Sequence, residues 1–422
     1  MTATKHTPIK SSAKAKRTFN PIRHIVDTLK PPANHPKPFL NLALGDPTAH
    51  GLNPPEVLKA AMHASIDTNK SNGYLPSTGE PKARVAIAAY SSRENFTVDE
   101  DDVIIASGCS GAVELAISAM LNEGDNVLVP TPGFPLYQVI IESLGGNAKS
   151  YPLDPSKQWE CDLDAMDKLV DDKTRAILIN NPSNPCGANY SAEHLKAIAA
   201  IARKHGLPLI ADEIYAGIVF DGVFTPMNTV SGDVPVLSLG GLAKEFVCPG
   251  WRVGWIVVHD RDDRLAEVKI GIKQLTQLIV GANSLAQACI PQVLTPVPDS
   301  DDAKSLALYS KEYVSLLANN SKATVDLSKG CSGLEVIEAQ GAMYAMVRVE
   351  IEQLDGIEDD ADFARQLLQE ENMIVLPGSC FGIKNFVRIL TCPTYAVIED
   401  AMSRIQAFCD KKKANGGKRK HP

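Results

Sequence analysis

The stretch Ala176-Ile177-Leu178-Ile179 indicates the fold class, because its apolar residues run without interruption into Asn180-Asn181-Pro182. Similar short apolar runs that stop at polar, glycine or proline residues occur at 103–107, 126–129, 208–211, 236–237 and 255–258. Segments with helical character separate them, among them 112–121 and a helix that Ser191 caps. Nearly continuous apolar strands separated by helices predict an α/β fold with a mainly parallel sheet flanked by helices.

Polar residues follow several of these runs, and Asp212 after residues 208–211 is one example. In parallel sheets, ligands bind beyond the carboxyl ends of the strands. We therefore expect the functional site at that edge of the sheet.

The pattern changes after about residue 315, which predicts a second, smaller α/β domain. Strands are expected at 342–349 and 386–390, and helices at 363–370 and 396–409. Part of the N-terminal segment is expected to join this domain. The predicted organisation is a disordered basic tail at 1–17, an N-terminal arm with part of the small domain at 18–70, a large domain at 71–315, the small domain at 316–410 and a basic tail at 411–422.

Composition excludes several classes of protein. The 42 Lys and Arg residues against 50 Asp and Glu give a net charge of −8, which argues against a dedicated nucleic-acid binder. No apolar run approaches the ~18 residues of a membrane-spanning helix. The 9 cysteines lack CxxC spacing, which favours a reducing compartment. We expect a cytoplasmic protein, and the basic N-terminus leaves a mitochondrial transit peptide open.

Several well-known signatures are missing. The sequence has no GxGxxG, GxxxxGK[ST] or HExxH motif, and its histidines show no metal-ligand spacing, so we expect no metal site. The segment Gly108-Cys109-Ser110-Gly111 is one residue short of the GxSxG elbow of serine hydrolases.

One constellation of motifs remains. It comprises Asn181-Pro182-Ser183-Asn184-Pro185-Cys186-Gly187, Ala211-Asp212-Glu213-Ile214-Tyr215, Ser238-Leu239-Gly240-Gly241-Leu242-Ala243-Lys244 and Pro249-Gly250-Trp251-Arg252-Val253-Gly254. In order and spacing, with Arg252 eight positions after Lys244, it resembles the fold-type-I aminotransferases that depend on pyridoxal 5′-phosphate (PLP). The resemblance covers most of the chain.

The resemblance implies three catalytic residues. Lys244 supplies the amine for Schiff-base exchange with the cofactor aldehyde and for a 1,3-proton shift. Asp212 keeps the pyridine nitrogen protonated, and Tyr215, with Asn184, hydrogen-bonds the phenolic oxygen of the ring. Taken alone, Asp212 would more commonly be a helix cap, and Asn184 could be a turn residue.

Further residues are implied for the cofactor and the substrate. Gly108, Cys109 and Ser110 lie where a strand meets a helix and would bind the phosphate, together with Arg252 and Ser238. Phe134 would stack on the ring, and Tyr74 would reach the phosphate of a partner subunit, which implies a homodimer with shared active sites. Arg388 would bind the substrate carboxylate, next to Gly45 and Asn184.

The segments Thr18-Phe19-Asn20-Pro21-Ile22-Arg23 and Gly341-Ala342-Met343-Tyr344 resemble the branch of this family that acts on tyrosine. The implied reaction moves an amino group from tyrosine, or from other aromatic or apolar amino acids, to a 2-oxo acid such as 2-oxoglutarate or pyruvate. Glu245 and Phe246 depart from that branch. A broad alanine-type aminotransferase and a PLP-dependent lyase of the same fold stay open, and so does a binding protein without catalysis.

Overall fold

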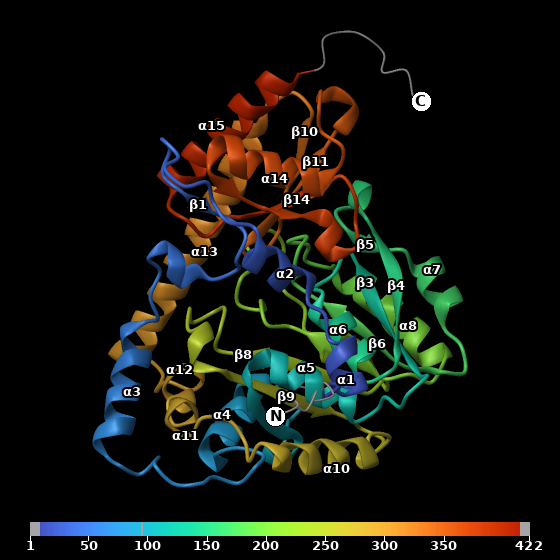
Figure 1. Cartoon of the computed structure of the whole chain (residues 1–422). Coiled ribbons are helices and arrows are strands. Elements are labelled where there is room, and N and C mark those ends of the chain that lie inside the picture. Colours follow the sequence, from blue (N-terminus) through green and yellow to red (C-terminus); the bar gives the residue numbers. More distant parts are fainter. Residues whose placement is uncertain (1–8, 94–95, 414–422) are drawn as a thin grey trace, which may run out of the picture.

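An eight-stranded sheet forms the centre of the large domain in this computed structural model, which describes residues 9–93 and 96–413 (Figure 1). In spatial order the strands are β2 (Val103–Ser107), β9 (Val253–His259), β8 (Val236–Gly241), β7 (Leu209–Asp212), β6 (Thr174–Asn180), β3 (Asn126–Thr131), β4 (Asn147–Asp154) and β5 (Glu160–Cys161). Five neighbouring strands, β8, β7, β6, β3 and β4, run parallel to one another, whereas β9 is antiparallel to both of its neighbours. The predicted fold class, a mainly parallel sheet flanked by helices, is confirmed.

The two faces of the sheet bury alternate residues of each strand. In β6, Ala176 and Leu178 pack into the apolar cluster that contains α5 (Gly108–Ser118) and α6 (Leu136–Ser143). Ile177 and Ile179 pack into the cluster on the other face, which contains α7 (Leu163–Leu169) and α8 (Ala192–Lys204). As predicted, Ser191 caps α8, and its hydroxyl accepts a hydrogen bond from the His194 backbone N–H at 3.1 Å.

The remaining elements of the large domain lie around the β2–β9 edge and the connections of the sheet. The helices are α3 (Glu56–Asp67), α4 (Pro81–Ser91), α9 (Met227–Val230), α10 (Ala266–Leu275), α11 (Ser284–Gln287) and α12 (Ile290–Leu294). The short 3₁₀ turns of the whole chain are η1 (Pro47–His50), η2 (Glu100–Asp102), η3 (Pro155–Lys157), η4 (Pro249–Trp251), η5 (Thr276–Leu278), η6 (Ile351–Gln353) and η7 (Gly378–Phe381).

The small domain carries an antiparallel sheet of four strands. They are, in order, β10 (Leu334–Ile337), β11 (Tyr344–Val349), β14 (Phe386–Leu390) and β13 (Leu376–Pro377). The helices α13 (Asp301–Ser328), α14 (Asp360–Glu371) and α15 (Tyr395–Lys412) belong to it. The N-terminal strand β1 (Leu40–Asn41) pairs in parallel with β12 (Met373–Ile374), so the N-terminal segment contributes to this domain. The domain limit expected near residue 315 falls inside the continuous helix α13.

Both ends of the described chain are more ordered than the expected basic tails. Residues Ala13–Arg17 form helix α1, and Arg17 donates to the Ser143 carbonyl at 3.3 Å, so the last part of the segment 1–17 is folded. Lys411 and Lys412 belong to α15, where Lys411 pairs at 3.0 Å with the buried carboxylate of Glu371. The rest of the two expected tails, 1–8 and 414–422, lies outside the described residues. Across the described part of the chain, no helix has the length and apolar character to cross a bilayer.

Asn320 links α13 to the chain that leads into α15. Its side-chain amide is 1% exposed and donates to the carbonyls of Thr391 at 2.8 Å and Pro393 at 2.6 Å. We predict that Asn320→Ala lowers the free energy of unfolding by about 1–3 kcal/mol, because it leaves buried carbonyl oxygens without a donor. Denaturant unfolding measures this change. The exposed neighbour Asn319 provides the control, and an equal loss in Asn319→Ala would contradict the prediction.

Candidate active site

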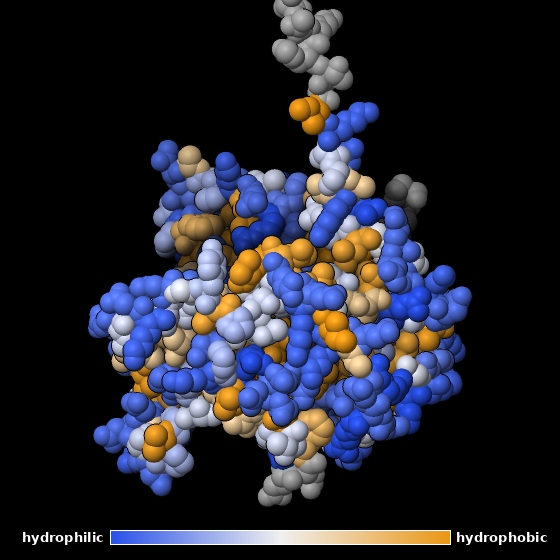
Figure 2. Space-filling model, turned by 90° about the horizontal axis from the view of Figure 1, so that it is seen from below, coloured by the Kyte–Doolittle hydropathy of each residue, from blue (hydrophilic) through white to orange (hydrophobic). Residues whose placement is uncertain are grey.

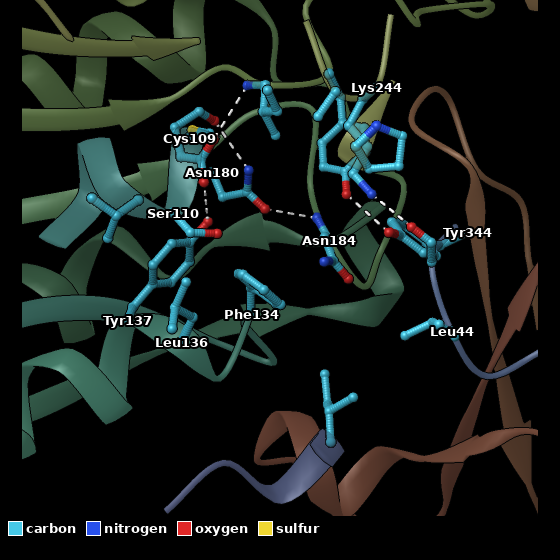
Figure 3. Close-up of a pocket in the computed structure, with 18 of the residues that line it drawn as sticks. Leu44, Cys109, Ser110, Phe134, Leu136, Tyr137, Asn180, Asn184, Lys244 and Tyr344 are labelled. Atoms are coloured by element: carbon cyan, nitrogen blue, oxygen red, sulfur yellow. Dashed lines mark hydrogen bonds between the residues drawn. The ribbon is translucent and has the colours of Figure 1, made fainter. Parts of the chain in front are cut away.

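A cavity of about 340 Å³ lies where the carboxyl ends of the central strands meet the small domain and helix α2 (Pro21–Thr28) (Figure 3). This is the edge of the sheet at which the sequence predicts a site. The cavity brings together ten of the predicted residues, namely Gly45, Cys109, Ser110, Phe134, Asn184, Asp212, Tyr215, Lys244, Arg252 and Arg388.

Asp212 ends strand β7 and is 4% exposed. Its carboxylate accepts hydrogen bonds from the Tyr137 hydroxyl at 2.7 Å, the Ile214 backbone N–H at 3.2 Å and the Cys109 thiol at 3.5 Å. Burial raises the pKa of Asp212, and the hydrogen bonds oppose that rise only in part. A cation beside this carboxylate would stabilise its charged form.

Lys244 follows strand β8 and extends into the cavity. Its Nζ donates to the Gly45 carbonyl at 2.6 Å. A side chain at position 45 would collide with the Tyr344 hydroxyl, so glycine is required for the chain to pass this close. The primary amine of Lys244 is thereby held at the side of the cavity formed by the N-terminal arm.

A cradle for an anion lies at the start of α5. Gly108 has a φ of +72°, and a Cβ at this position would lie 2.6 Å from the Arg252 guanidinium. Arg252 donates to the carbonyls of Pro249 at 2.9 Å and Ser107 at 3.3 Å, and it has no carboxylate partner within the described residues. The free backbone N–H groups of a helix N-terminus beside an unpaired guanidinium are suited to a phosphate group.

Arg388 forms a second cationic site on strand β14. It is 2% exposed, and it donates to the Asn184 side-chain oxygen at 2.8 Å and the Ala43 carbonyl at 2.5 Å. Its Nε has no hydrogen-bond partner, and no acidic side chain in the described part of the chain pairs with it. Burial lowers the pKa of Arg388. A buried guanidinium without a counter-ion is best stabilised by an anionic ligand.

Tyr215 lies between these two cationic sites. Its hydroxyl is 2.9 Å from the Tyr344 hydroxyl, and the Arg388 guanidinium stacks 4.2 Å from the centre of the Tyr344 ring. Burial and the neighbouring Tyr344 raise the pKa of Tyr215, so the phenol remains protonated. Since the Asn184 side-chain oxygen accepts from Arg388, the Asn184 amide N–H₂ stays available as a donor.

Three predicted residues are not among those that line the cavity, namely Ser238, Tyr74 and Gly108, which directly precedes the lining residue Cys109. Ser238 lines a separate, smaller cavity with Glu213 and Glu245. Residues alternate between the faces of a strand, and position 238 of β8 faces away from the main cavity, so we do not assign Ser238 to the phosphate. Tyr74 is 94% exposed and lies outside the cavity of its own chain.

A profile of the family described as "Aminotransferase class I and II" matches residues 37–405. The chain belongs to this family. Among its relatives, the tyrosine aminotransferase of Dictyostelium discoideum is 41% identical over 408 residues, which cover 95% of this chain and 96% of the relative. The human tyrosine aminotransferase is 40% identical over 406 residues, covering 95% of this chain and 87% of the relative.

Solved structures of other aminotransferases are also similar to this aminotransferase. The tyrosine aminotransferase of Leishmania infantum superposes with a TM-score of 0.91 at 37% identity, covering 97% of this chain and all of the other. The alanine aminotransferase of Pyrococcus furiosus superposes with a TM-score of 0.87 at 28% identity, covering 96% of this chain and all of the other. The resemblance to PLP-dependent aminotransferases stated from the motifs is confirmed.

Aminotransferases of this family use PLP, and the cavity of this aminotransferase fits that cofactor. The cradle of Gly108 and Arg252 matches the phosphate. The buried Asp212 carboxylate, which lacks a paired cation among the described side chains, matches the protonated ring nitrogen. Lys244 supplies the amine that the aldehyde requires.

Several residues of this aminotransferase site were not predicted. Tyr137 and Asn180 surround Asp212, and Figure 3 shows Asn180 reaching toward Asn184, whose backbone N–H donates to the Asn180 side chain at 2.7 Å. Asn180 stands at a strand end, which could have indicated its position. Nothing in the local sequence indicates Tyr137, since it reaches Asp212 from helix α6. Other residues that line the cavity and were not predicted as site residues are Asn20, Ile22, Arg23, Leu44, Leu136 and Tyr344.

The cradle at Gly108 can be tested by adding one methyl group. We predict that Gly108→Ala weakens PLP binding strongly, because the new Cβ would lie 2.6 Å from the Arg252 guanidinium and position 108 has a positive φ. Titration of the cofactor-free protein with PLP, followed by absorbance, measures the dissociation constant. Gly111→Ala is the control in the same helix, since its Cβ would meet no atom closer than 3.6 Å. Equal affinities of the two variants would contradict the prediction.

Proposed function

We propose that this aminotransferase transfers the amino group of tyrosine, and of other aromatic or apolar amino acids, to a 2-oxo acid. One observation carries the proposal. A single cavity is lined by an amine, Lys244, and by two guanidinium groups, Arg252 and Arg388, which form no ion pair within the described residues. A phosphorylated cofactor and an amino-acid carboxylate supply the two matching anions. The tyrosine aminotransferases among the relatives, at about 40% identity over almost the whole chain, support tyrosine as the donor.

Five groups of the chain would hold the cofactor in place. Arg252 and the N-terminus of α5, at Gly108, Cys109 and Ser110, would bind its phosphate. Asp212 would keep the ring nitrogen protonated, with Tyr137 and Cys109 orienting the carboxylate. Asn184 and Tyr215 would donate to the ring oxygen, and Phe134 would cover the ring face. When bound, PLP supplies an electron sink that stabilises negative charge on the substrate Cα.

Lys244 would move the proton in this reaction. With PLP bound, its Nζ would accept the proton from the substrate Cα, and the resulting ammonium would donate it in the second half of the 1,3-proton shift. The Gly45 carbonyl, 2.6 Å from Nζ, limits where the amine can point. The walls around it include Ala243 and Ile214, which restrict the access of water to the amine.

Arg388 would orient the substrate. Its unpaired Nε and its terminal nitrogens offer a fork of donors to the α-carboxylate, and the contacts with Asn184 and Ala43 fix the guanidinium plane. Anchoring this carboxylate would restrict how the substrate Cα is presented to Lys244. Binding energy at Arg388 is thereby used to set the geometry of the proton transfer.

The N-terminal arm would select the substrate side chain. Ile22 on α2 and Leu44 line the cavity beside Leu136 and Phe134, and these apolar walls suit an aromatic ring. Asn20 and Arg23 line the same cavity and offer polar contacts to a phenolic hydroxyl or to a second carboxylate. The site can in this way take tyrosine as donor and a dicarboxylic 2-oxo acid, such as 2-oxoglutarate, as acceptor.

A homodimer is part of the proposal. Tyr74 is exposed next to other exposed apolar residues, and hydrogen bonds from Thr276 to Ser77 and from Ser284 to Ser71 hold its loop against the chain around 276–284. The exposed apolar residues of these two segments and the adjoining end of α3 are Ile66, Leu278, Ile279 and Val280. Figure 2 views the lower end of the molecule and shows hydrophobic residues among hydrophilic ones on that face. A second copy would cover these residues and receive Tyr74 at its cofactor phosphate.

The proposed compartment is a reducing one, the cytoplasm or the mitochondrial matrix. All 9 cysteines carry free thiols and are buried, and burial raises the pKa of most of them, for example that of Cys161 to about 12. Such thiols are unreactive and contribute as small apolar side chains.

We predict that the purified protein with PLP converts tyrosine and 2-oxoglutarate to 4-hydroxyphenylpyruvate and glutamate. Lys244→Ala should abolish this turnover, because no other lysine among the described residues lines the cavity. A matrix of amino donors and 2-oxo acid acceptors, measured by chromatography of the products, tests the assignment. Exposed Lys196→Ala is the matched control and should turn over as the native chain does. Ammonia release without a new amino acid would indicate a lyase, and a preference for alanine over tyrosine would indicate an alanine-type enzyme.

Complementation between subunits tests the role of Tyr74. Lys244→Ala and Tyr74→Ala chains are each expected to turn over poorly at limiting PLP. When they are refolded together, half of the dimers are hybrids and each hybrid contains one intact site, so we predict recovery of about a quarter of the native activity. If Tyr74 served the site of its own chain, no hybrid would contain an intact site and mixing would restore nothing.

A further inference from the structure

A second cavity, of about 130 Å³, lies behind the catalytic segments and is not part of the active site. Glu213 and Glu245 both line it, and each directly follows a residue of the active site, Asp212 and Lys244. Within the described residues, neither glutamate forms an ion pair. Two acidic side chains that form no ion pair therefore share one small cavity beneath the catalytic residues, and Arg93 also lines it.

The two glutamates have different contacts. Glu213 accepts a hydrogen bond from the Met227 backbone N–H at 2.8 Å, which fixes it to the start of α9. Glu245 lies against Gly217 instead. A Cβ at position 217 would stand 2.5 Å and 2.7 Å from its two carboxyl oxygens. Gly217 follows shortly after Asp212 and Tyr215, so the Glu245 carboxyl bridges the segment of Lys244 to the segment of those two residues.

We propose that Glu245 is a positioning residue for Lys244, whose carboxyl group, seated on Gly217 and hydrogen-bonded by Tyr90, holds the Lys244 segment against the segment that carries Asp212 and Tyr215. It does not touch the cofactor or the substrate. It acts by fixing the backbone from which Lys244 extends into the active site.

The groups that face Glu245 are Tyr90 on α4, Arg93 just after α4, Glu213 just after β7, His259 on β9 and Tyr309 on α13. The Tyr90 hydroxyl donates to Glu245. Arg93 directs its guanidinium to the carbonyls of Tyr90 at 2.8 Å and Ser92 at 2.7 Å. Burial, together with Arg93, lowers the pKa of His259 to about 3, so that ring is neutral at physiological pH.

Burial raises the pKa of Glu245 from its ordinary value of 4.5 to about 7, and that of Glu213 likewise to about 7. The folded state thus binds more protons than the unfolded chain between these values, and stability falls as the pH rises from about 4.5 through about 7. Above that range Glu245 is charged inside a buried site, and the cost of desolvating that charge opposes its seat against Gly217. The contact at Gly217 is therefore most favourable while Glu245 is protonated.

The unfolding of the cofactor-free chain tests this bridge without any assay of activity. Glu245→Gln keeps the shape and removes the titration, so its melting temperature should fall less than that of the native chain between pH about 5.5 and about 8.5. Exposed Glu352→Gln is the control and should follow the native chain. If the melting temperature of Glu245→Gln falls as steeply with pH as that of the native chain, the proposal is wrong.

The activity measurements rest on the proposed function and separate positioning from general stability. Glu245→Ala should lower kcat at pH about 6.5 by roughly threefold or more with KM for tyrosine little changed, and Glu245→Gln should restore it. The ratio of kcat in Glu245→Gln to kcat in the native enzyme should rise from pH about 6.5 to about 8.5. Native kcat in Glu245→Ala, or a ratio that stays constant, would overturn the proposal. Absence of tyrosine turnover in the native enzyme would refute the proposed function and leave the unfolding test unaffected.

A double-mutant cycle tests the contact itself. Gly217→Ala places a methyl group on the Glu245 carboxyl and should lower kcat in the native background. The same change made together with Glu245→Ala no longer meets the three atoms nearest to that methyl group and should cost little further activity. Equal effects of Gly217→Ala in both backgrounds would show that the two residues are not coupled, which contradicts the proposal.

Discussion

The structure depends on two positive charges that the protein itself does not neutralise. Arg388 is almost fully buried, and its Nε has no acceptor. Arg252 donates hydrogen bonds to two backbone carbonyls. Burying the Arg388 guanidinium in this way is unfavourable without an anionic ligand, and the two charges together suit a cofactor phosphate at one site and a substrate carboxylate at the other. The sheet, the arm and the small domain bring the two charges and Lys244 to one cavity.

Much of this site could be predicted from the sequence, because several of its functional side chains lie at or just after the ends of strands. Asp212 and Asn184 each follow an apolar run, and the parallel order of those runs places them at one edge. Lys244 and Arg252 are assigned because the motifs around them, with their order and spacing, resemble those of a known family. Ser238 shows the limit of such reasoning: it belongs to the right strand, but the strand alternates, and a shift by one position moves a side chain to the opposite face.

Other features depend on tertiary packing that no local pattern records. Tyr137 reaches Asp212 from a helix, and Arg23 reaches the cavity because α2 packs on the small domain through Ile22. Strand β4 was missed because its residues 147–150 are exposed or half-buried and give no apolar run. The hydrophobic pattern also cannot predict that β9 is antiparallel to its neighbours, because an apolar run looks the same in either direction. The resemblance to a known family supplied what the residues alone left open.

Helix α13 has a mechanical consequence. At 28 residues it is about 42 Å long, and its side chains belong to both the small-domain core and the large domain, from Leu306 to Thr324. An unbroken helix resists stretching and shear along its axis, so α13 forms a rigid connection between the large and the small domain. Any swing of the small domain, and with it of Arg388, has to pivot about this helix and to be absorbed in the arm that carries Leu44 and Gly45.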